Sequence, residues 1–317
     1  INCESRFDIK SWIKLYKIIK KNNYDIIHTH HHFTGFLSRF LKLFNLNFKK
    51  VHSFGNNFSR FSLPARIIHD MTIFLEDKII CVSQEVKDSF NSFERKIINK
   101  KSNVVYNGIK IKEIDREKGK PVNIKGFNFD EDEFVICSVG RFIPQKDQKT
   151  LIRGFAKAKK KIENIKLVIV GDGYLKDELK SLVSELNLGN NIYFTGLIER
   201  REVYRILHNI DLFVMTSLWE GFSAVVLQAM ASYNPIVVTD IPSFKEAIHN
   251  GVSGEIISTG SPEALAKAII KIYENPPLAE KYSNNARKKI VENFTVEKTA
   301  EGYKKVYSDL LGCDLLE

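Results

Sequence analysis

Short apolar runs alternate with helical patterns along the whole chain of 317 residues. Runs of four to six apolar, largely β-branched residues predict buried strands, and the amphipathic stretches between them predict crossover helices. This alternation is typical of parallel sheets connected by helices, so an α/β protein is expected. The predicted strands are 25–30, 50–54, 78–83, 103–106, 134–139, 167–170, 192–195, 212–216, 235–239 and 254–257. One helix face repeats apolar residues at Leu175, Leu179, Leu182, Val183 and Leu186.

The stretch 111–126 interrupts this alternation between the fourth and fifth predicted strands. It is charged, contains Gly and Pro and lacks periodicity, which predicts a linker between two domains. We expect an N-terminal domain over 1–115 and a C-terminal domain over 116–295. A last amphipathic helix within 296–317 is expected to cross back to the N-terminal domain.

Composition excludes several classes of protein. Hydrophobic residues make up 44% and charged residues 27%, as in globular proteins, and no apolar run approaches the roughly 20 residues of a membrane span. The four cysteines are scattered without a C-x-x-C spacing, which argues against a disulfide framework or a zinc site. The chain begins Ile1-Asn-Cys-Glu4, with no signal peptide. A cytoplasmic location is therefore expected.

The net charge of +10 allows a solvated lysine-rich surface, an anionic membrane partner or a nucleic acid. No nucleic-acid-binding module is present, so no nucleic acid partner is expected. The opening helix places Lys10, Lys14, Lys17 and Lys21 on one stripe, opposite a face that is largely apolar. That stripe could lie on the inner face of a membrane, or it could simply face water on an ordinary crossover helix.

Candidate chemistry follows two of the predicted strands. Arg141 and Lys146 come after strand 134–139, and Glu220 comes after strand 212–216 at the start of a helix. The carboxyl ends of parallel strands meet at one edge, where ligands bind. Cations and helix-terminal N–H groups hold phosphate, and a carboxylate accepts hydrogen bonds from sugar hydroxyls. The pattern predicts a nucleotide-sugar site; the competing interpretation is two surface cations and a plain Glu-Gly turn.

The histidines His28, His30, His31 and His32 end the first predicted strand. Strand alternation places His28 and His30 on one side. His30 could face a ligand cleft, end the strand as a satisfied polar residue, or bind a metal. No acidic or Cys ligand accompanies the cluster, and we expect no metal. Which of the three successive histidines points inward stays open.

The order of the motifs resembles the family 4 retaining glycosyltransferases, which have the GT-B fold. The resemblance covers nearly the whole chain and is densest over 134–257. It implies two Rossmann-like parallel-sheet domains facing a central cleft, with the donor bound mainly by the C-terminal one. The matching segments are Asp25–His30, Asn107–Gly108, Gly140–Lys146, Gly171–Gly173, Phe194–Gly196, Ser217–Ser223 and Gly251–Gly254.

This resemblance implies a hexosyl- or N-acetylhexosaminyl-type enzyme of polysaccharide biosynthesis (EC 2.4). It would transfer sugar from a nucleoside diphosphate sugar to a glycan or lipid-linked acceptor, with retention and without a cofactor. The implied catalytic residues are Glu220, His30, Arg141 and Lys146. The implied donor-binding residues are Gly140, Arg141, Lys146, Gly171, Gly173, Gly196, Glu220, Gly221, Phe222, Ser223, Ala224 and Gln228.

Three departures from the family pattern keep other functions open. Gln228 stands where the family has a second Glu that accepts from the ribose, and Tyr233 stands where it usually has Gly. The N-terminal domain lacks roughly 60 residues of the family pattern, so it is expected to be incomplete. A non-catalytic nucleotide-sugar-binding relative or partner subunit is the main alternative, followed by a sugar-nucleotide epimerase. Gly171–Gly173 lacks the third Gly of a dinucleotide fingerprint, since Lys176 stands there.

Overall fold

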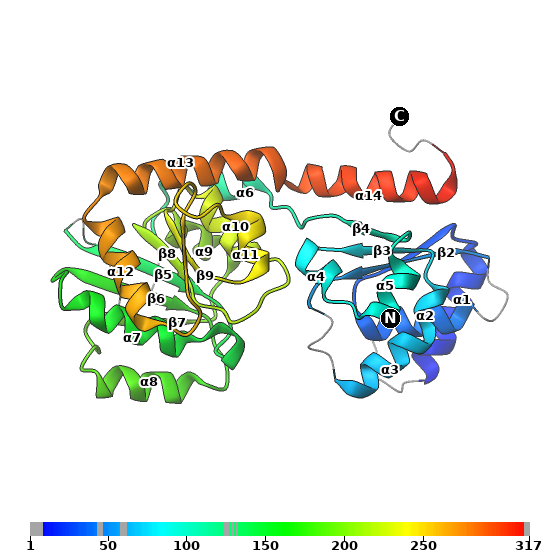
Figure 1. The fold of residues 1–317 in the computed structure, drawn as a ribbon, viewed down its shortest axis with the longest axis horizontal. Helices are drawn as coiled ribbons and strands as arrows, with labels where there is room; N and C mark the ends of the chain where they lie inside the picture. Colours follow the sequence, from blue (N-terminus) through cyan, green and yellow to red (C-terminus); the bar gives the residue numbers. More distant parts are fainter. Residues whose placement is uncertain are drawn as a thin grey trace. The chain divides into compact units, whose positions relative to one another are not determined.

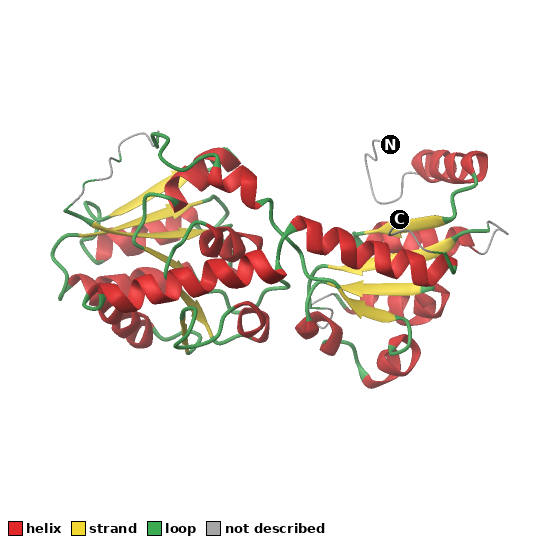
Figure 2. Cartoon of the chain, turned by 90° about the horizontal axis from the view of Figure 1, so that it is seen from above, coloured by secondary structure: helices red, strands yellow, loops and turns green. Residues whose placement is uncertain are grey.

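The computed structural model describes residues 9–42, 47–57, 62–122, 127, 130 and 132–313, which form two compact units (Figure 1). Unit 1 contains the described residues up to Asn107 together with those from Glu297 onward, and unit 2 is Gly108–Val296. Each unit is a parallel β-sheet covered by helices, the Rossmann-like arrangement expected from the sequence. Viewed from above, helices lie across the strands of both units (Figure 2).

Unit 1 is built on a four-stranded sheet in the order β1-β2-β3-β4, all parallel. Its strands are β1 (Ile26–Thr29), β2 (Lys49–Phe54), β3 (Lys78–Cys81) and β4 (Ser102–Val104). Its helices before the linker are α1 (Ile9–Asn22), α2 (His32–Lys42), α3 (Leu63–Thr72), η2 (Ile73–Leu75), α4 (Gln84–Asp88) and α5 (Ser92–Ile98).

The last helix, α14 (Val296–Leu311), belongs to unit 1. Its Val306 is buried in a cluster with Val51, Ile80 and Val105. Thr299 Oγ1 donates a hydrogen bond to the carbonyl of Tyr106 at 2.8 Å. The helix therefore completes the core on one face of the sheet of unit 1.

Unit 2 is built on a six-stranded parallel sheet in the order β10-β9-β8-β5-β6-β7. Its main core cluster joins Ile136, Leu167 and Val237 of the sheet to Phe155 and Ile269 of the covering helices. The strands are β5 (Phe134–Val139), β6 (Ile165–Val170), β7 (Ile192–Gly196), β8 (Leu212–Met215), β9 (Ile236–Thr239) and β10 (Glu255–Ile257). The helices are α6 (Ile111–Asp115), η3 (Pro144–Lys146), α7 (Gln148–Lys159), α8 (Lys176–Glu185), α9 (Arg200–Leu207), α10 (Ala224–Ala231), α11 (Pro242–Ala247), α12 (Pro262–Tyr273) and α13 (Pro276–Asn293).

The ten predicted strands all form, with ends that differ from the prediction by no more than two residues. They form because continuous apolar runs are buried on both faces of a parallel sheet. Within the described residues no helix is both long enough and apolar enough to span a bilayer.

The predicted linker is wrong in its first part. Residues 111–115 form α6, whose Ile114 is fully buried and whose Asp115 accepts a hydrogen bond from Arg287 Nη2 at 2.7 Å. The boundary therefore falls between Asn107 and Gly108 rather than after residue 115. The sequence pattern did not indicate this helix because three of its five residues are charged and only Ile114 is buried. Residues 123–126 of the predicted linker lie outside the described residues.

Candidate functional site

The loop after β5 carries Arg141 and Lys146 to the carboxyl edge of the sheet of unit 2. Gly140 N donates to the carbonyl of Val170 at 2.9 Å, and Phe142 N donates to the carbonyl of Asp172 at 2.9 Å. The Phe142 side chain is completely buried and anchors the loop. The loop is thus fixed along its backbone, while its two cations are left at the edge.

A second loop, between β8 and α10, is bonded to the first. Thr216 Oγ1 donates to the carbonyl of Lys146 at 3.0 Å. Gln145 Nε2 donates to the carbonyl of Trp219, and the N–H of Leu218 donates back to the carbonyl of Gln145, both at 2.8 Å. Because β5 and β8 are neighbours in the sheet, the two loops form one bonded framework. The sequence motifs included Gln145, but they did not predict that Thr216 would connect the two loops by a hydrogen bond.

Lys146 and Glu220 meet within this framework as an ion pair between Lys146 Nζ and Glu220 Oε1. Ser217 Oγ donates to the same carboxylate oxygen at 2.7 Å. The side chain of Lys146 is 14% exposed and that of Glu220 is 9% exposed. Because water reaches both charges poorly, each is stabilised mainly by the other. An anion that binds Lys146 in place of Glu220 would leave the Glu220 carboxylate able to accept other hydrogen bonds.

Arg141 differs from Lys146 in being exposed. Its carbonyl accepts a hydrogen bond from Gln148 Nε2 at 2.8 Å, so its backbone is held. Its guanidinium forms no ion pair with any residue that the structure describes. It therefore offers donors to an incoming anion without first breaking an internal ion pair.

The start of α10 lies directly after Glu220. Its N-cap residue Ser223 makes no side-chain cap, so the first N–H groups of the helix have no side-chain acceptor there. Gly221 and Phe222 are buried, and the ring of Phe222 lies 5.2 Å from that of Phe294. Ala224 is exposed and Gln228 is half-buried one turn further along the helix. Uncapped N–H groups at the start of a helix are suited to binding an anion.

The two glycines of Gly171–Gly173 are required by the loop framework itself. Gly171 has φ +137°, and a Cβ there would lie 2.0 Å from the carbonyl oxygen of Gly140. A Cβ on Gly173 would lie 2.5 Å from the carbonyl oxygen of Phe142. Gly196 has φ +70° with open space around it, and its carbonyl accepts the N–H of Gly171 at 3.1 Å. These glycines thus allow the ends of β5, β6 and β7 to lie against one another.

Tyr233 takes the left-handed conformation that its position requires. It follows α10 with φ +64°, where the family pattern has Gly. Its ring lies 5.0 Å from the guanidinium carbon of Arg287 and 6.0 Å from Lys118 Nζ. These cation–π contacts offset part of the backbone strain that a side chain with Cβ meets there.

The histidines lie at the carboxyl end of β1 in unit 1. The rings of His28 and His30 are 4.2 Å apart, and His30 is exposed. His28 Nδ1 lies 2.5 Å from Tyr307 Oη and His28 Nε2 lies 2.7 Å from Ser53 Oγ. His31 instead takes part in the turn that begins α2, where its Nδ1 accepts from Phe33 N at 3.3 Å. The side chain of His32 lies outside the described residues.

The electrostatics of this end of β1 favour neutral imidazoles. Burial, helped by neighbouring His30 and Lys50, lowers the pKa of His28 to about 3. Burial and Lys50 also lower the pKa of His30. Among the described residues, no group of three His, Cys, Asp or Glu side chains is placed to hold a metal ion. His30 therefore stands as an exposed, uncharged imidazole near neutral pH.

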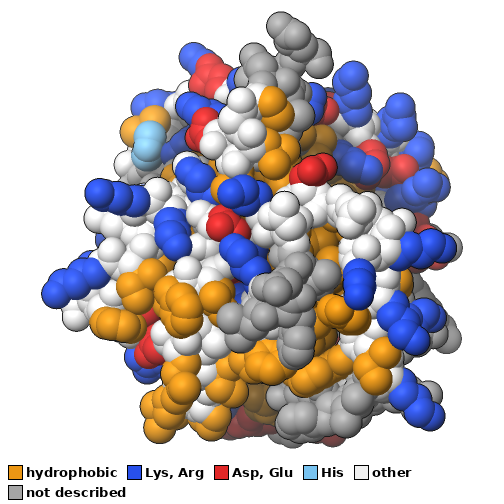
Figure 3. Space-filling model, turned by 90° about the vertical axis from the view of Figure 1, so that its right-hand side faces the viewer, with side chains coloured by type: hydrophobic (Ala, Val, Ile, Leu, Met, Phe, Trp, Pro, Cys, Tyr) orange, Lys and Arg blue, Asp and Glu red, His pale blue; other side chains and the backbone are white. Residues whose placement is uncertain are grey.

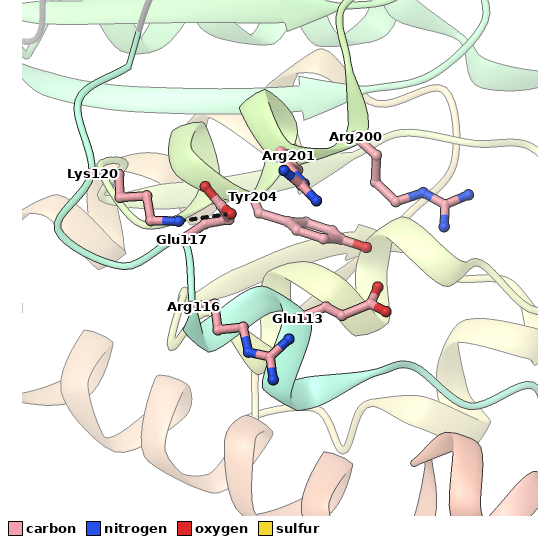
Figure 4. A pocket seen from close by; sticks show the side chains of 7 residues that line it. All are labelled: Glu113, Arg116, Glu117, Lys120, Arg200, Arg201 and Tyr204. Atoms are coloured by element: carbon pink, nitrogen blue, oxygen red, sulfur yellow. Dashed lines mark hydrogen bonds and ion pairs between the residues drawn. The ribbon is translucent and has the colours of Figure 1, made fainter.

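A hollow of about 610 Å³ lies elsewhere in unit 2, between α6 and α9 (Figure 4). Tyr204 points into it, and a dashed line joins Lys120 to Glu117. Glu117 accepts from Arg205 Nε at 2.8 Å and from Lys120 Nζ at 3.0 Å, and these bonds lower its pKa. Because none of the residues predicted for the donor site lines it, we assign it no part in the candidate site. Its lining residues are Glu113, Arg116, Glu117, Lys120, Arg200, Arg201 and Tyr204.

Two Rossmann-like units with this arrangement define a protein of the GT-B class. The family model "Glycosyl transferases group 1" matches residues 119–289, and "Glycosyltransferase Family 4" matches residues 1–113. The chain belongs to the glycosyl transferases group 1 family, and it is a glycosyltransferase.

Relatives agree with this family, and solved structures share its fold. The chain is 30% identical to the Escherichia coli UDP-Gal:alpha-D-GlcNAc-diphosphoundecaprenol alpha-1,3-galactosyltransferase, over 96% of this chain and 80% of that protein. It is 30% identical to a Campylobacter jejuni diphospho-undecaprenol 4-alpha-N-acetylgalactosaminyltransferase, over 59% of this chain and 48% of that protein. Among solved structures, a Rickettsia africae glycosyltransferase has a TM-score of 0.84 at 21% identity, covering 98% of this chain and 84% of that one. Anabaena HepE with UDP has a TM-score of 0.80 at 21% identity, covering 92% of this chain and 81% of that one.

Proposed function

We propose that this glycosyltransferase moves a hexosyl or N-acetylhexosaminyl group from a nucleoside diphosphate sugar to a glycan or lipid-linked acceptor, with retention. The observation that carries the proposal is the meeting of Lys146, Glu220 and the uncapped start of α10 at one edge of the sheet. A diphosphate needs cations and N–H donors, and a sugar needs a hydrogen-bond acceptor beside them. This edge supplies both within one bonded framework.

The arrival of the donor would rearrange the ion pair. Its diphosphate would bind Arg141, Lys146 and the N–H groups at the start of α10. Glu220, released from Lys146, would accept hydrogen bonds from the sugar hydroxyls, and Gln228 would accept from the ribose. Because two cations would neutralise the leaving diphosphate, we propose that the reaction proceeds without a divalent metal or other cofactor.

Retention is proposed to occur by attack on the face from which the diphosphate departs. The bond between the anomeric carbon and the phosphate oxygen breaks, and its electron pair leaves with the diphosphate. The acceptor oxygen bonds to the same face of that carbon, and its proton passes to the departing phosphate oxygen. Glu220 is engaged by Lys146 and Ser217 rather than held as a nucleophile. In this proposal His30 is a catalytic residue that supplies a neutral imidazole.

A lipid-linked acceptor is supported by the names of two relatives. Both the Escherichia coli and the Campylobacter jejuni enzymes are named for substrates attached to diphosphoundecaprenol. The Escherichia coli name also specifies UDP-galactose as donor. We extend the lipid-linked acceptor class and a UDP-sugar donor to this chain, with action at the inner face of a membrane.

A donor screen tests the proposal before the acceptor is known. Nucleoside diphosphate sugars are added singly, and the unfolding temperature of unit 2 is followed, because a bound ligand stabilises the folded state by mass action. At least one donor should raise this unfolding temperature.

Products with a lipid-linked acceptor are then analysed by NMR for the anomeric configuration, with and without EDTA. Donor binding without turnover would support the partner-subunit alternative, and an isomerised nucleotide sugar would support an epimerase. An inverted product, or loss of turnover with EDTA, would overturn the corresponding part of the proposal.

A further inference from the structure

Helix α3 is amphipathic in the reverse sense, with its polar side chains turned into the protein. His69 is 5% exposed, and its Nδ1 lies 3.2 Å from Arg39 Nη1. Thr72 Oγ1 accepts from the same Arg39 nitrogen at 3.0 Å. Arg39 is itself 2% exposed and pairs through Nε with Glu76 Oε1 at 2.5 Å. The inward face of α3 is therefore fixed by a buried ion pair.

The outward face of α3 is apolar along its length. At about 100° per residue, the exposed residues of the helix fall on one side, and all are apolar. Leu63, Ile67 and Met71 form a ridge one turn apart, with exposed fractions of 67%, 50% and 70%. Phe74 of η2 and Phe93 of α5 are each 58% exposed, and η2 packs against both α3 and α5. We name these five residues the α3 ridge.

The helix cannot rotate to hide this ridge. Rotation would draw His69 and Thr72 away from Arg39 and break two hydrogen bonds of its buried guanidinium. A buried charge that loses hydrogen-bond partners is costly. An exposed apolar surface that the core cannot absorb is typical of a binding face. Figure 3 faces this end of unit 1 and shows hydrophobic side chains gathered along the lower part, the level at which α3 lies in Figure 1.

The charges beside the ridge indicate what covers it. In α3, η2, α5 and the turn after α5, the charged side chains that are exposed are Arg95, Lys96 and Lys100, all cations. The acids of these elements are turned inward: Glu76 and Glu94 are completely buried and Asp70 is half-buried. An apolar ridge with cations beside it complements an anionic bilayer. A second copy of the chain fits less well, because a two-fold contact would bring like charges together.

The lysine stripe of α1 lacks this combination. Opposite its lysines, Ile19 is 4% exposed and packs with Leu41 and Phe48, with Leu15 and Tyr16 against them. Most of the apolar face of α1 is therefore used by the core, and Ile13, 50% exposed, is the one large apolar side chain of its described residues left outside with the cations. Helix α1 thus offers a bilayer charge but much less apolar surface than α3.

We propose that the α3 ridge is the surface by which unit 1 docks on a bilayer of anionic lipid, with Leu63, Ile67, Met71, Phe74 and Phe93 entering the headgroup boundary. The docking itself follows from the geometry of unit 1. Its purpose, to bring the enzyme to a lipid-linked acceptor, rests on the function proposed above.

Cosedimentation with vesicles tests the proposal on the whole chain. Wild-type protein should bind vesicles of 30% phosphatidylglycerol in phosphatidylcholine and should bind pure phosphatidylcholine about tenfold or more less tightly. Ile67→Ser/Met71→Ser should lose about tenfold or more of the binding to anionic vesicles. The matched control Val252→Ser/Val291→Ser removes side chains in unit 2 that are 47% and 50% exposed and should bind as wild type. The variant Lys14→Gln/Lys17→Gln measures how much the lysine stripe of α1 contributes to vesicle binding. If it lost as much vesicle binding as Ile67→Ser/Met71→Ser, the assignment of docking to the α3 ridge would be overturned.

A second measurement covers the case in which the double serine variant fails to fold. Tryptophan fluorescence of Met71→Trp should shift to shorter wavelength with anionic vesicles and be quenched by brominated lipid, whereas Val291→Trp should not. Unchanged vesicle binding by Ile67→Ser/Met71→Ser, or no spectral shift at position 71, would overturn the proposal. A dimer in sedimentation velocity that the serine variant dissociates, without effect on vesicles, would assign the ridge to a second copy instead. Nucleoside diphosphate binding by these variants reports on unit 2, so failure of the donor proposal is seen separately.

Discussion

Lys146 and Glu220 stand 74 positions apart in the sequence and form one ion pair at the carboxyl edge of the sheet of unit 2. The pair exists because β5 and β8 are neighbours and because the loops that follow them share backbone and side-chain hydrogen bonds. Each charge is largely removed from water, so each compensates the other until a ligand arrives. The cation proposed to bind phosphate is thereby held next to the carboxylate proposed to bind the sugar.

Lys146→Ala should reduce turnover by about 10²–10³, because one preorganised cation that stabilises developing charge is lost. The structure adds a second effect, since the variant leaves Glu220 buried without its cation. We expect a loss of about 1–3 kcal/mol in the free energy of unfolding of unit 2, less than for a fully buried pair because both side chains retain some exposure. Thermal unfolding and kcat on a verified substrate measure the two effects.

The double variant Lys146→Ala/Glu220→Gln separates stability from activity. It should recover most of the stability, because the unpaired carboxylate is gone, and none of the turnover. Lys149→Ala is the matched control, since Lys149 pairs with Glu178 at 2.5 Å on the exposed surface and should change neither quantity appreciably. Full turnover in the double variant would show that Lys146 takes no part in catalysis.

Gln228 should act on nucleotide affinity rather than on folding. It lies one turn into α10, half-buried, beyond the uncapped N–H groups. If it accepts from the ribose, Gln228→Glu should retain or tighten nucleoside diphosphate binding. Gln228→Leu should weaken binding by about 1–3 kcal/mol, because ribose hydroxyls are left unpaired. Isothermal titration gives the three dissociation constants, and equal values would show that position 228 does not contact the nucleotide.

Tyr233 should be a site of measurable backbone strain. Tyr233→Gly and Tyr233→Ala both remove the ring and its contacts with Arg287 and Lys118, but only Gly adopts φ +64° without cost. The Gly variant should therefore be more stable than the Ala variant by about 1 kcal/mol. For a unit of this size the difference is roughly 2–4 °C in Tm. Equal Tm values for the two variants would mean that the turn relaxes to another conformation.

His28 should make unit 1 less stable as the pH falls below about 6.5. Its folded pKa is lowered to about 3, so between these values the unfolded chain binds a proton that the folded unit does not. Folding then loses at most about 1.4 kcal/mol per pH unit from this residue, starting at pH 6.5 and complete near pH 3. NMR of the imidazole should show His28 still neutral at pH 5. His28→Gln should flatten the pH dependence of unfolding of unit 1, whereas His249→Gln, on the surface of unit 2, should not.

The α/β alternation and the candidate loops could be predicted because strands buried on both faces require continuous apolar runs. Strand β5 was predicted residue for residue, and the predicted last helix is present as α14, since both have strong local patterns. Helix α6 was missed because its five residues carry more charge than apolar surface, and only Ile114 is buried. The exposed face of α3 was not recognised because a reversed amphipathic helix has the same periodicity as an ordinary one.

The sequence by itself determined the class of fold, the order of the motifs and the types of side chain available at the site, because these depend on local periodicity and on residue chemistry. The tertiary structure decided which of those side chains meet. It paired Lys146 with Glu220, required glycine at positions 171 and 173 because the backbones of two loops touch, and turned the apolar side of α3 outward. Contacts between residues far apart in the chain follow from strand neighbours and buried partners, and no local pattern encodes them.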